Sequence, residues 1–516
     1  MAFSPNESQK LALKRWNKNV LVSAGAGSGK TAVLTERIKR IIESGVMPTN
    51  LLVLTFTKDA ANEMRTRVKN KLNEDPSLRK YLPSLEQAYF TTFDSFSLSF
   101  CKKYSYLLSL GQDISIVDEN TIFVKKNEIL RDIFNEYLLN NDPIFKEFLS
   151  IYTQKSLDTG IALILDYIKG LDLLYNPIDK INELTNPNNF DKFYNDIKDK
   201  YNSYLKSLAN DIFIDLSILP NVFTDDNQAS DLKENVLSYF SNGFDFDKFN
   251  EIVPTYKFKR RNSKCDIEQT EEEKKFFAKV KDSISFYIEA LTYKDYVVSD
   301  IQNNNRFISL FKDIILNYYD KINLFKKSLN LFEYNDIARM SIELLEKNSK
   351  ICEEVKNQYV EILIDEYQDT SDLQEKFMSL IANDNLFMVG DIKQSIYRFR
   401  HANPNNFREK YNSYDKLYEE DEEHNGLFLN KQIDMNKSKG LRIDMTQNFR
   451  SRKEVLDNIN KMFSVIMTEE HGNAKFAESH QMIYGNLYSL NEPNRDYNMK
   501  ILNYDKDADT SYEDIF

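Results

Sequence analysis

A glycine-rich segment that contains one lysine, residues 25–31 (GAGSGKT), follows directly on the apolar run of residues 19–23. The apolar run predicts a buried strand, and the residues after Thr31 have the apolar spacing of an amphipathic helix. Because glycine has no β-carbon, the backbone N–H groups of such a loop can approach an anion closely, and the positive end of the helix dipole adds to the attraction. The order of strand, glycine loop and helix therefore predicts a site for the phosphates of a nucleoside triphosphate, in which Lys30 reaches the β- and γ-phosphates and the Thr31 hydroxyl binds Mg²⁺.

The segment departs at one position from the strict pattern of such loops, since Ala24 stands where the first glycine is required. A glycine-rich turn between a strand and a helix, with an unrelated lysine, is therefore the other interpretation. The strand before the loop and the helix after it favour the phosphate site. The predicted nucleotide-binding residues of the loop are Ala24, Gly25, Ala26, Gly27, Ser28, Gly29, Lys30 and Thr31.

An apolar run that ends in two carboxylates, residues 362–366 (ILIDE), supplies the second half of the predicted site. The carboxyl ends of parallel strands are where an α/β sheet presents groups to its ligand. Asp365 is predicted to hold Mg²⁺, directly or through water, and Glu366 to orient and deprotonate the water that attacks the γ-phosphate. The alternative is a buried strand followed by an acidic turn, but a Mg²⁺–nucleotide site needs a strand of this kind.

Residues 389–400 (VGDIKQSIYRFR) combine a strand end with an aromatic and basic segment. The strand is expected to end at the Gly-Asp turn, which places Gln394 where a neutral amide can sense the γ-phosphate without competing for Mg²⁺. Tyr397, Arg398 and Phe399 alternate aromatic and basic side chains, which suits single-stranded DNA because rings stack on bases and arginines meet phosphates. A short amphipathic helix with buried aromatic rings is the other interpretation.

A polar segment, residues 447–452 (QNFRSR), follows the last predicted strand. Arg450 is a candidate to reach the γ-phosphate as an arginine finger within the same chain. Phe449 is a candidate to stack on the adenine ring. Without the other segments, these residues would be interpreted only as the polar start of a helix.

Short apolar runs separated by helical periodicity occupy the first hundred residues and return after residue 359. Between about residues 101 and 359 the apolar spacing is helical, and proline and glycine are sparse. The runs predicted as strands are 20–22, 51–54, 88–91, 360–365, 386–390 and 441–445. Strands that alternate with helices predict the α/β fold class with a parallel sheet, interrupted here by a large, mostly helical insertion.

The charge balance, 80 Asp and Glu against 68 Lys and Arg, argues against nonspecific binding of nucleic acid by overall charge, although it allows a local basic groove. The three cysteines have no Cys-x-x-Cys spacing and the four histidines have no ligand spacing, so no zinc or iron–sulfur site is predicted. The start of the sequence lacks the apolar core of a signal peptide, and no apolar run approaches membrane-spanning length. A soluble, cytoplasmic protein without a membrane partner is expected.

Taken in chain order, these segments resemble the motifs of superfamily 1 DNA helicases of the UvrD/Rep type, and most of all those of the AddA-like helicase–nuclease proteins. Ala24 is a usual variant in the first motif of that family, and residues 365–370 (DEYQDT) match its Walker B motif almost letter for letter. Residues 390–400 favour the AddA-like subfamily. The resemblance implies a RecA-like P-loop NTPase sheet and 3′→5′ movement along single-stranded DNA, driven by hydrolysis of ATP with Mg²⁺.

The resemblance also implies roles for residues that the spacing alone does not assign. Gln9 would contact the adenine base, and residues 55–65 (TFTKDAANEMR) are similar to a motif that touches single-stranded DNA. Three positions depart from the family: Lys58 replaces a usual Asn, Asp94 a usual His, and Phe449 a usual Tyr. The implied DNA-binding residues are Thr55, Phe56, Thr57, Lys58, Phe96, Tyr397, Arg398 and Phe399.

The resemblance implies an order of domains as well. Residues 1–105 and 359–447 would form the first RecA-like domain (1A), 106–358 its helical insertion (1B), and 448–516 the beginning of the second RecA-like domain (2A). The family continues with the rest of that domain, a 2B insertion and, in AddA-like proteins, a nuclease, so the N-terminal part of a longer protein is expected. The implied partners are single-stranded DNA or duplex ends and an AddB-like protein in a heterodimer, with a role in double-strand break repair and recombination.

Two other classes of function remain open. The chain can be a module that binds ATP and DNA without unwinding DNA by itself, because the rest of the motor is missing. It can also be an unrelated P-loop NTPase of the AAA+ or ABC type, although residues 394–400 and 447–452 argue against this. The basic cluster of the insertion, residues 257–261 (KFKRR), is either a contact to duplex phosphates or a solvated surface.

Overall fold

The structure of the chain is a computed structural model that describes residues 4–153, 156–222, 227–258, 270–398, 401–421, 426–430, 432–467, 476 and 481–485. Contacts divide the chain into two compact units, which are treated separately below. The first, called the sheet unit, comprises residues 1–123, 172–175 and 323–516. The second, called the helical unit, comprises residues 124–171 and 176–322.

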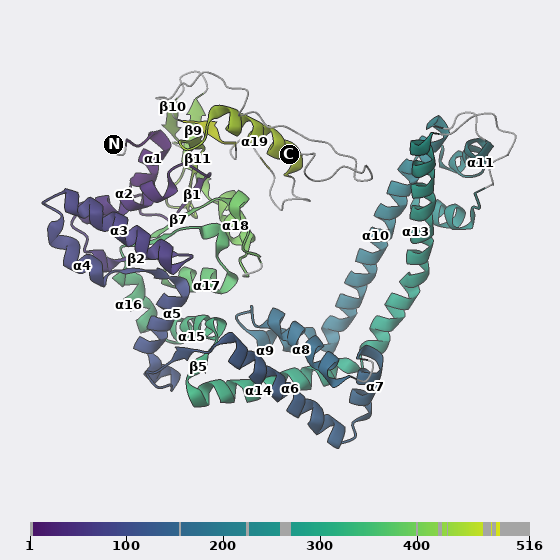
Figure 1. Cartoon of the computed structure of the whole chain (residues 1–516), viewed down its shortest axis with the longest axis horizontal. Helices are drawn as coiled ribbons and strands as arrows, with labels where there is room; N and C mark the ends of the chain where they lie inside the picture. The colour runs from purple at the N-terminus through teal and green to yellow at the C-terminus, as the bar shows by residue number, and fades with distance from the viewer. Residues whose placement is uncertain are drawn as a thin grey trace, which may run out of the picture. The chain divides into compact units, whose positions relative to one another are not determined.

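The sheet unit is built on one parallel sheet of seven strands in the order β3-β2-β6-β7-β1-β11-β8. The strands are β1 Val20–Ala24, β2 Leu51–Thr55, β3 Tyr89–Thr92, β6 Glu361–Ile364, β7 Leu386–Gly390, β8 Asp415–Lys416 and β11 Leu441–Met445. Figure 1 shows them together, with segments from both ends of the chain side by side. The predicted α/β class with a parallel sheet is confirmed.

Strands from distant parts of the sequence alternate in this sheet. Val22 of β1 pairs with Val389 of β7 on one side and with Ile443 of β11 on the other, and Val53 of β2 pairs with Leu363 of β6. The carboxyl ends of β1, β6 and β7 therefore meet at one edge of the sheet. This edge is where the loops that carry the predicted nucleotide site begin.

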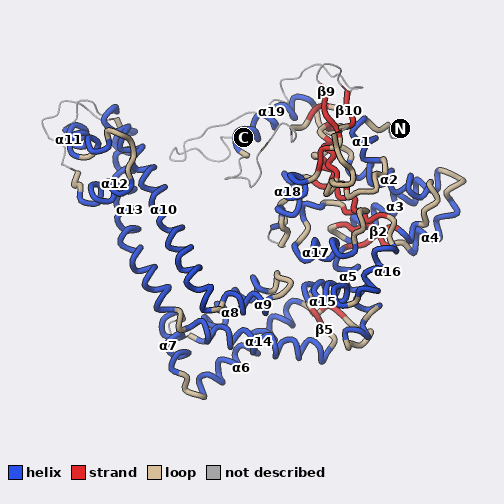
Figure 2. Tube along the Cα trace, turned by 180° about the vertical axis from the view of Figure 1, so that it is seen from behind, coloured by secondary structure: helices blue, strands red, loops and turns tan. Residues whose placement is uncertain are grey.

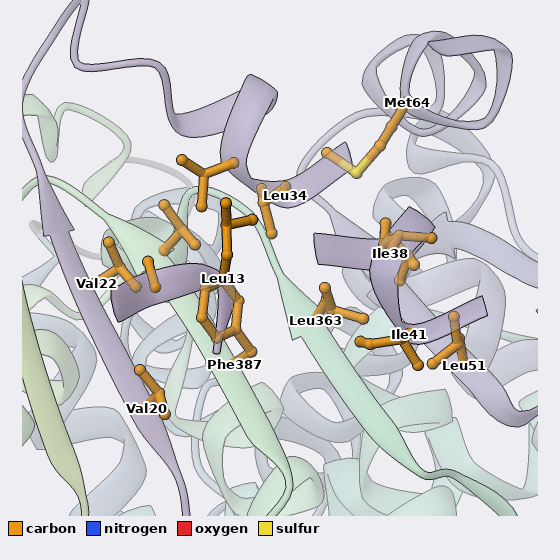
Figure 3. Close-up of a cluster of buried hydrophobic side chains, with 14 of the residues drawn as sticks. Leu13, Val20, Val22, Leu34, Ile38, Ile41, Leu51, Met64, Leu363 and Phe387 are labelled. Carbon is orange, nitrogen blue, oxygen red and sulfur yellow. The ribbon is translucent and has the colours of Figure 1, made fainter. Parts of the chain in front are cut away.

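Helices cover both faces of the sheet, so its central strands are apolar on both sides. One face packs against α1 Glu7–Leu13, α2 Lys30–Glu43, α3 Lys58–Glu74 and α4 Leu82–Gln87. The other packs against α5 Phe93–Lys103, α15 Tyr334–Lys347, α16 Ser349–Gln358, α17 Asp372–Ile381 and α18 Pro404–Ser413. In Figure 3, Leu34 and Ile38 of α2 lie over Leu363 and Phe387 of the sheet.

Smaller elements complete the sheet unit. They are β4 Ser115–Ile116 paired with β5 Leu331–Phe332, β9 Tyr418–Asp421 with β10 Gly426–Leu429, and β12 Gln447–Asn448 with β13 Ile483–Tyr484, together with α19 Lys453–Ile466. The short 3₁₀ helices are η1 Pro48–Asn50, η2 Arg79–Tyr81, η3 Ser105–Leu108, η6 Tyr367–Asp369 and η7 Ile392–Gln394. The β4–β5 ladder joins the chain just before the helical unit to the chain just after it.

The helical unit contains only helices among its described residues, in blue in Figure 2. They are most of α6 Glu119–Leu139, then α7 Pro143–Tyr152, α8 Leu157–Leu171, α9 Pro177–Leu184, α10 Pro187–Val222, α11 Asn227–Asn235, η4 Leu237–Phe240, α12 Phe246–Ile252, η5 Val253–Thr255, α13 Glu271–Asn304 and the first part of α14 Phe307–Leu329. The long helices α10 and α13 lie side by side in both views. Phe249 of α12 and Tyr287 of α13 are fully buried beside them.

The contacts correct the predicted extent of the insertion, 106–358. Helices α15 and α16 pack on α5 and α17 under the sheet, so residues 334–358 belong to the sheet unit. The contacts also do not separate residues 448–516 from the sheet unit, although β12 and β13 form a small sheet of their own. Of the basic cluster 257–261, only Lys257 and Phe258 are described. Within the described residues, no helix combines the length and the apolar character needed to cross a membrane.

Candidate active site

The glycine-rich loop has the backbone expected of a phosphate cradle. It links the end of β1 at Ala24 to the start of α2 at Lys30. Gly27 and Gly29 have φ angles of 72° and 87°, in the left-handed region that only glycine enters without strain. Gly29 is the N-cap of α2 and provides no side-chain cap, so the first N–H groups of a 14-residue helix are left for a ligand. The buried Ser28 Oγ also has no hydrogen-bond partner within the described structure, as expected of a group that awaits a polar ligand.

Lys30 and Glu366 meet across the sheet edge. Lys30 begins α2 after β1, and Glu366 follows β6, which β7 separates from β1. The Lys30 Nζ lies 3.1 Å from Glu366 Oε2, although the two residues are 336 positions apart in the sequence. The predicted convergence of the glycine loop and the carboxylate strand is therefore present in the structure.

Glu366 adopts an unusual backbone conformation. Its φ and ψ angles are 51° and 47°, in the left-handed region that costs a non-glycine residue free energy. Such strain persists where the surroundings fix it, and it is concentrated at functional sites. Here it turns the chain sharply from β6 into η6.

Asp365 has the environment of a cation ligand. Burial, followed by the negative charge of Glu366, raises the pKa of the Asp365 carboxyl from 3.8 to about 6, although Lys30 opposes the shift. A divalent cation would favour the charged form of this carboxylate. No group of three or more metal-binding side chains occurs among the described residues, which suits Mg²⁺, because this ion is usually held by one or two protein ligands together with phosphate oxygens and water. Asp365 and Thr31 fit that role.

Asp369 gives the site a pH-dependent stability. Its side chain is 6% exposed, its Oδ1 has no hydrogen-bond partner within the described structure, and burial, followed by the charge of Glu366, raises its pKa from 3.8 to about 7. Folding thus favours the protonated form, and ionisation of Asp369 costs stability as the pH rises from about 4 to about 7.

We expect Asp369→Asn to raise the free energy of unfolding by roughly 1–2 kcal/mol at pH 8 and to change it little at pH 4, because the amide never ionises. Denaturant unfolding, followed by the fluorescence of Trp16, measures this effect in the sheet unit, since the chain has one tryptophan. An equal effect at both pH values would contradict the assignment.

Gln394 lies in η7, directly after β7. Its Nε2 donates to Asp391 Oδ2 at 2.8 Å, and the Lys393 Nζ lies 2.9 Å from Asp391 Oδ1. Asp391 is 1% exposed, so this small network fixes η7 to the end of β7. Gln394 is thereby held at the sheet edge that also carries Glu366.

The segment after β11 contacts the glycine loop directly. The Asn448 Nδ2 donates to the Ala26 carbonyl at 2.6 Å, and the Phe449 N–H donates to the Gly27 carbonyl at 2.9 Å. A β-carbon at Gly27 would lie 2.9 Å from the Arg450 Cβ, so only glycine fits there. Phe449 and Arg450 are therefore adjacent to the predicted phosphate site, and the Phe449 side chain is 40% exposed.

Gln9 is also at the loop, but its amide already has partners. The Gln9 Nε2 donates to the Ser28 carbonyl at 2.9 Å, and its Oε1 accepts from the Asn6 N–H at 3.0 Å. The side chain is 2% exposed. In this structure Gln9 supports the glycine loop, and its predicted contact to adenine stays a prediction.

Several predicted DNA-binding residues gather at the same edge of the sheet. The rings of Phe56, after β2, and Tyr397, after η7, are 4.6 Å apart with their planes tilted by 35°. Lys58 and Arg398 are exposed, and Thr57 caps α3 by accepting from the Ala60 N–H. Two aromatic rings flanked by exposed cations suit bases and phosphates.

Two predicted DNA contacts are wrong, and a third falls outside the described residues. Phe96 is 4% exposed and packs edge-on against Phe377, 6.0 Å away, in the core under the sheet. Thr55 is 5% exposed, and its hydroxyl donates to the Thr57 carbonyl at 2.8 Å. A base cannot reach either side chain. Phe399 lies outside the described residues.

Sequence reasoning missed two residues of the site, Gln368 and Asn448. Gln368 stands within the DEYQDT segment and donates to Glu366 Oε2, while Asn448 holds the glycine loop as described above. The signal for Gln368 was its place inside a recognised motif. Asn448 carried no signal of its own, because a polar residue after a strand is common.

Comparisons with known proteins agree with this geometry. A family model described as the UvrD/REP helicase N-terminal domain matches residues 5–415. Similar proteins include AddA, the larger-named half of the ATP-dependent helicase/nuclease, from Clostridium novyi, which is 29% identical over 93% of this chain and 40% of its own length. The proteins of the same name from Lactobacillus johnsonii and Clostridium acetobutylicum are each 30% identical, over 93% and 95% of this chain and 42% of their own length.

The chain thus spans about two fifths of the length of these curated relatives. The family model covers most of the chain, including the glycine loop, the carboxylate strand and the segment after β7. The chain therefore belongs to the UvrD/REP helicase family, through its N-terminal domain.

Proposed function

We propose that the chain is the ATP-hydrolysing part of a DNA translocase or helicase that moves 3′→5′ along single-stranded DNA. The observation that supports this most is the convergence of Lys30 and Glu366 at one edge of the sheet. A cation that can hold phosphate and a carboxylate that can orient water are the two groups that phosphoryl transfer to water requires. Family membership and the names of the relatives support the same reaction.

Each residue of the site has a defined task in this proposal. The N–H groups of the glycine loop and Lys30 bind the triphosphate, and Glu366 orients the attacking water and accepts its proton. Thr31 and Asp365 hold Mg²⁺, which when bound offsets negative charge on the phosphates. Gln394 and Arg450 contact the γ-phosphate, and Phe449 stacks on the base.

The DNA side of the proposal rests on the edge that carries Phe56 and Tyr397. Because both loops begin at strand ends that flank the nucleotide site, a shift of these strand ends on hydrolysis would move both rings. We expect Tyr397→Ala to weaken binding of single-stranded DNA by roughly 1–3 kcal/mol, or about 5- to 150-fold, since one stacking surface is lost. ATP affinity should change less than about twofold.

Fluorescence anisotropy with a labelled oligonucleotide measures the DNA affinity, and a fluorescent ATP analogue measures the nucleotide affinity. Tyr106→Ala is the matched control, because Tyr106 is 70% exposed and lies in η3, away from the strand ends. Equal loss of DNA and ATP binding in Tyr397→Ala would assign Tyr397 a structural role instead.

A second candidate function is an ATP-responsive DNA-binding module that does not unwind DNA by itself. The chain covers about 40% of the length of its relatives, which favours this alternative for the chain alone. The relatives are named as one subunit of a helicase/nuclease, which supports assembly with another protein, and an AddB-like partner stays a prediction. The role in double-strand break repair is likewise a proposal.

One experiment separates the two functions. ATP turnover by the purified chain is measured with and without single-stranded oligonucleotide, next to DNA binding over a range of salt concentrations. DNA-stimulated turnover supports the motor. Salt-sensitive DNA binding that responds to ATP without turnover supports the module, because phosphate contacts give a steep salt dependence. Absence of both activities would contradict both functions.

A further inference from the structure

The carboxylate assigned to the attacking water has two hydrogen-bond donors among the described residues. Glu366 Oε2 lies 3.1 Å from Lys30 Nζ and 2.9 Å from Gln368 Nε2. Lys30 cannot serve Glu366 and the phosphates fully at the same time, because its ammonium group must turn toward the triphosphate. Gln368 is then the donor that remains on Glu366.

We infer that Gln368 is the positioning residue that holds Glu366 in its hydrolytic orientation and ties it to the DNA-facing segment after β7. This inference rests on the proposed function. Gln368 is 1% exposed, so it touches neither DNA nor bulk water. Its role follows from what the two ends of its amide contact.

The donor end of the amide faces carboxylates. The Gln368 Nε2 also donates to Asp369 Oδ2 at 3.1 Å, in addition to Glu366. With both bonds made, the amide nitrogen cannot rotate away without leaving a buried carboxylate oxygen unpaired, which is costly. Glu366 is therefore held by a side chain that is itself fixed.

The acceptor end of the amide faces β7. The Gln368 Oε1 accepts from the Asp391 N–H at 2.9 Å, and a β-carbon at Gly390 would clash with this oxygen. Asp391 in turn binds Lys393 and Gln394 through its carboxylate, as described above. One side chain thus connects the proposed water-orienting carboxylate to the proposed γ-phosphate sensor.

The segment after β7 is tied to the loop after β6 at a second point. The Asn403 N–H donates to the Thr370 carbonyl at 2.9 Å, and the Asn403 Nδ2 donates to Asp372 Oδ1 at 2.7 Å. Tyr397, which pairs with Phe56, lies in the sequence between Asp391 and Asn403. A displacement of Tyr397 by DNA would therefore be transmitted to Asp391 and through Gln368 to Glu366.

Two substitutions separate the two ends of the amide. Gln368→Met removes both the donor and the acceptor at nearly constant volume. Gln368→Glu keeps an oxygen for the Asp391 N–H but removes the donor to Glu366. We expect both variants to lower kcat for ATP about 10- to 100-fold, as misplacement of a catalytic group does, with the affinity for a fluorescent ATP analogue within about twofold of wild type.

The acceptor end is read out by the stimulation of ATP turnover by single-stranded DNA. Gln368→Glu should keep the wild-type stimulation ratio within about twofold, whereas Gln368→Met should lose most of it, a change of at least about fivefold. A residue that only stabilised the fold would not separate the two variants in this way. Gln87→Met, at an exposed glutamine that ends α4, is the matched control and should retain all wild-type values.

The outcomes distinguish this inference from the proposed function. Wild-type turnover together with unchanged kcat in both variants overturns the role of Gln368 and leaves the function intact. Loss of DNA stimulation to the same extent in both variants overturns the link through Asp391. A wild-type chain without ATP turnover overturns the proposed function and this inference with it. If Gln368→Met does not fold, as judged by circular dichroism and nucleotide binding, unchanged kcat in Gln368→Glu alone overturns the positioning role.

Discussion

Replacing Lys30 by alanine is expected to lower ATP turnover by about 10²- to 10³-fold or more, the cost of removing a preorganised group that stabilises transition-state charge. The Lys30 side chain is 12% exposed and begins α2 next to the loop whose N–H groups await phosphate. Without the ammonium group, the charge that develops on the phosphates has one counter-charge less. Glu366 also loses its ion pair, although Gln368 still donates to it. Steady-state ATP hydrolysis with saturating single-stranded DNA measures the effect.

Lys39→Ala is the matched control for this substitution. Lys39 lies on the same helix, two turns further from the loop, and pairs with Glu43 at the helix surface at a distance of 3.0 Å. Loss of such a pair costs only about 0.3–0.5 kcal/mol and should leave turnover unchanged. Near-normal, DNA-stimulated turnover in Lys30→Ala would contradict the assignment of the site.

The sheet and the core of the site could be predicted because their residues carry local signals. A central parallel strand is covered on both faces, so runs such as 20–22 and 362–364 are continuously apolar. The glycine loop was recognisable because its left-handed backbone requires glycine at positions 27 and 29. Since parallel strands end at one edge, Lys30 and Glu366 could be expected to meet once both strands were assigned to the same sheet.

The errors arose where function depends on the direction in which a side chain points. An aromatic residue at the start of a helix looks the same in sequence whether its ring faces DNA or the core, and in α5 the ring of Phe96 faces Phe377. Thr55 is the last residue of a buried strand, and its hydroxyl closes the following turn. Only the tertiary contacts decide such cases.

The extent of the insertion and the role of Gln368 were hidden for a related reason. Helices α15 and α16 have the same periodicity as the helices before them, and only their packing on α5 and α17 assigns them to the sheet unit. The amide of Gln368 bridges Glu366 and Asp391, which follow different strands. No pattern within a short segment could show that bridge.

Arg37→Ala is expected to be the most destabilising of the substitutions considered, by about 3–5 kcal/mol, because it leaves a buried carboxylate without its counter-charge. The Arg37 Nε lies 2.5 Å from Glu361 Oε1, and the two side chains are 3% and 5% exposed. One guanidinium nitrogen, Nη1, also donates to the carbonyls of Ala12 and Lys14, at 2.6 Å and 2.9 Å. Burial lowers the pKa of Arg37 and Glu361 opposes this shift, but arginine remains charged. Arg37 therefore connects α2, the end of α1 and the start of β6.

Denaturant unfolding followed by Trp16 fluorescence suits this test, since Trp16 follows α1 and its Nε1 donates to the Leu11 carbonyl. Arg40→Ala on the same helix is the control. Arg40 is 46% exposed and pairs with Glu36 at 3.4 Å, so its loss should cost less than about 1 kcal/mol. Adding Glu361→Gln to Arg37→Ala should recover part of the lost stability, because the unpaired charge is then absent. If the two substitutions were instead simply additive, the carboxylate would not be the source of the cost, and the three hydrogen bonds of Arg37 would carry its contribution.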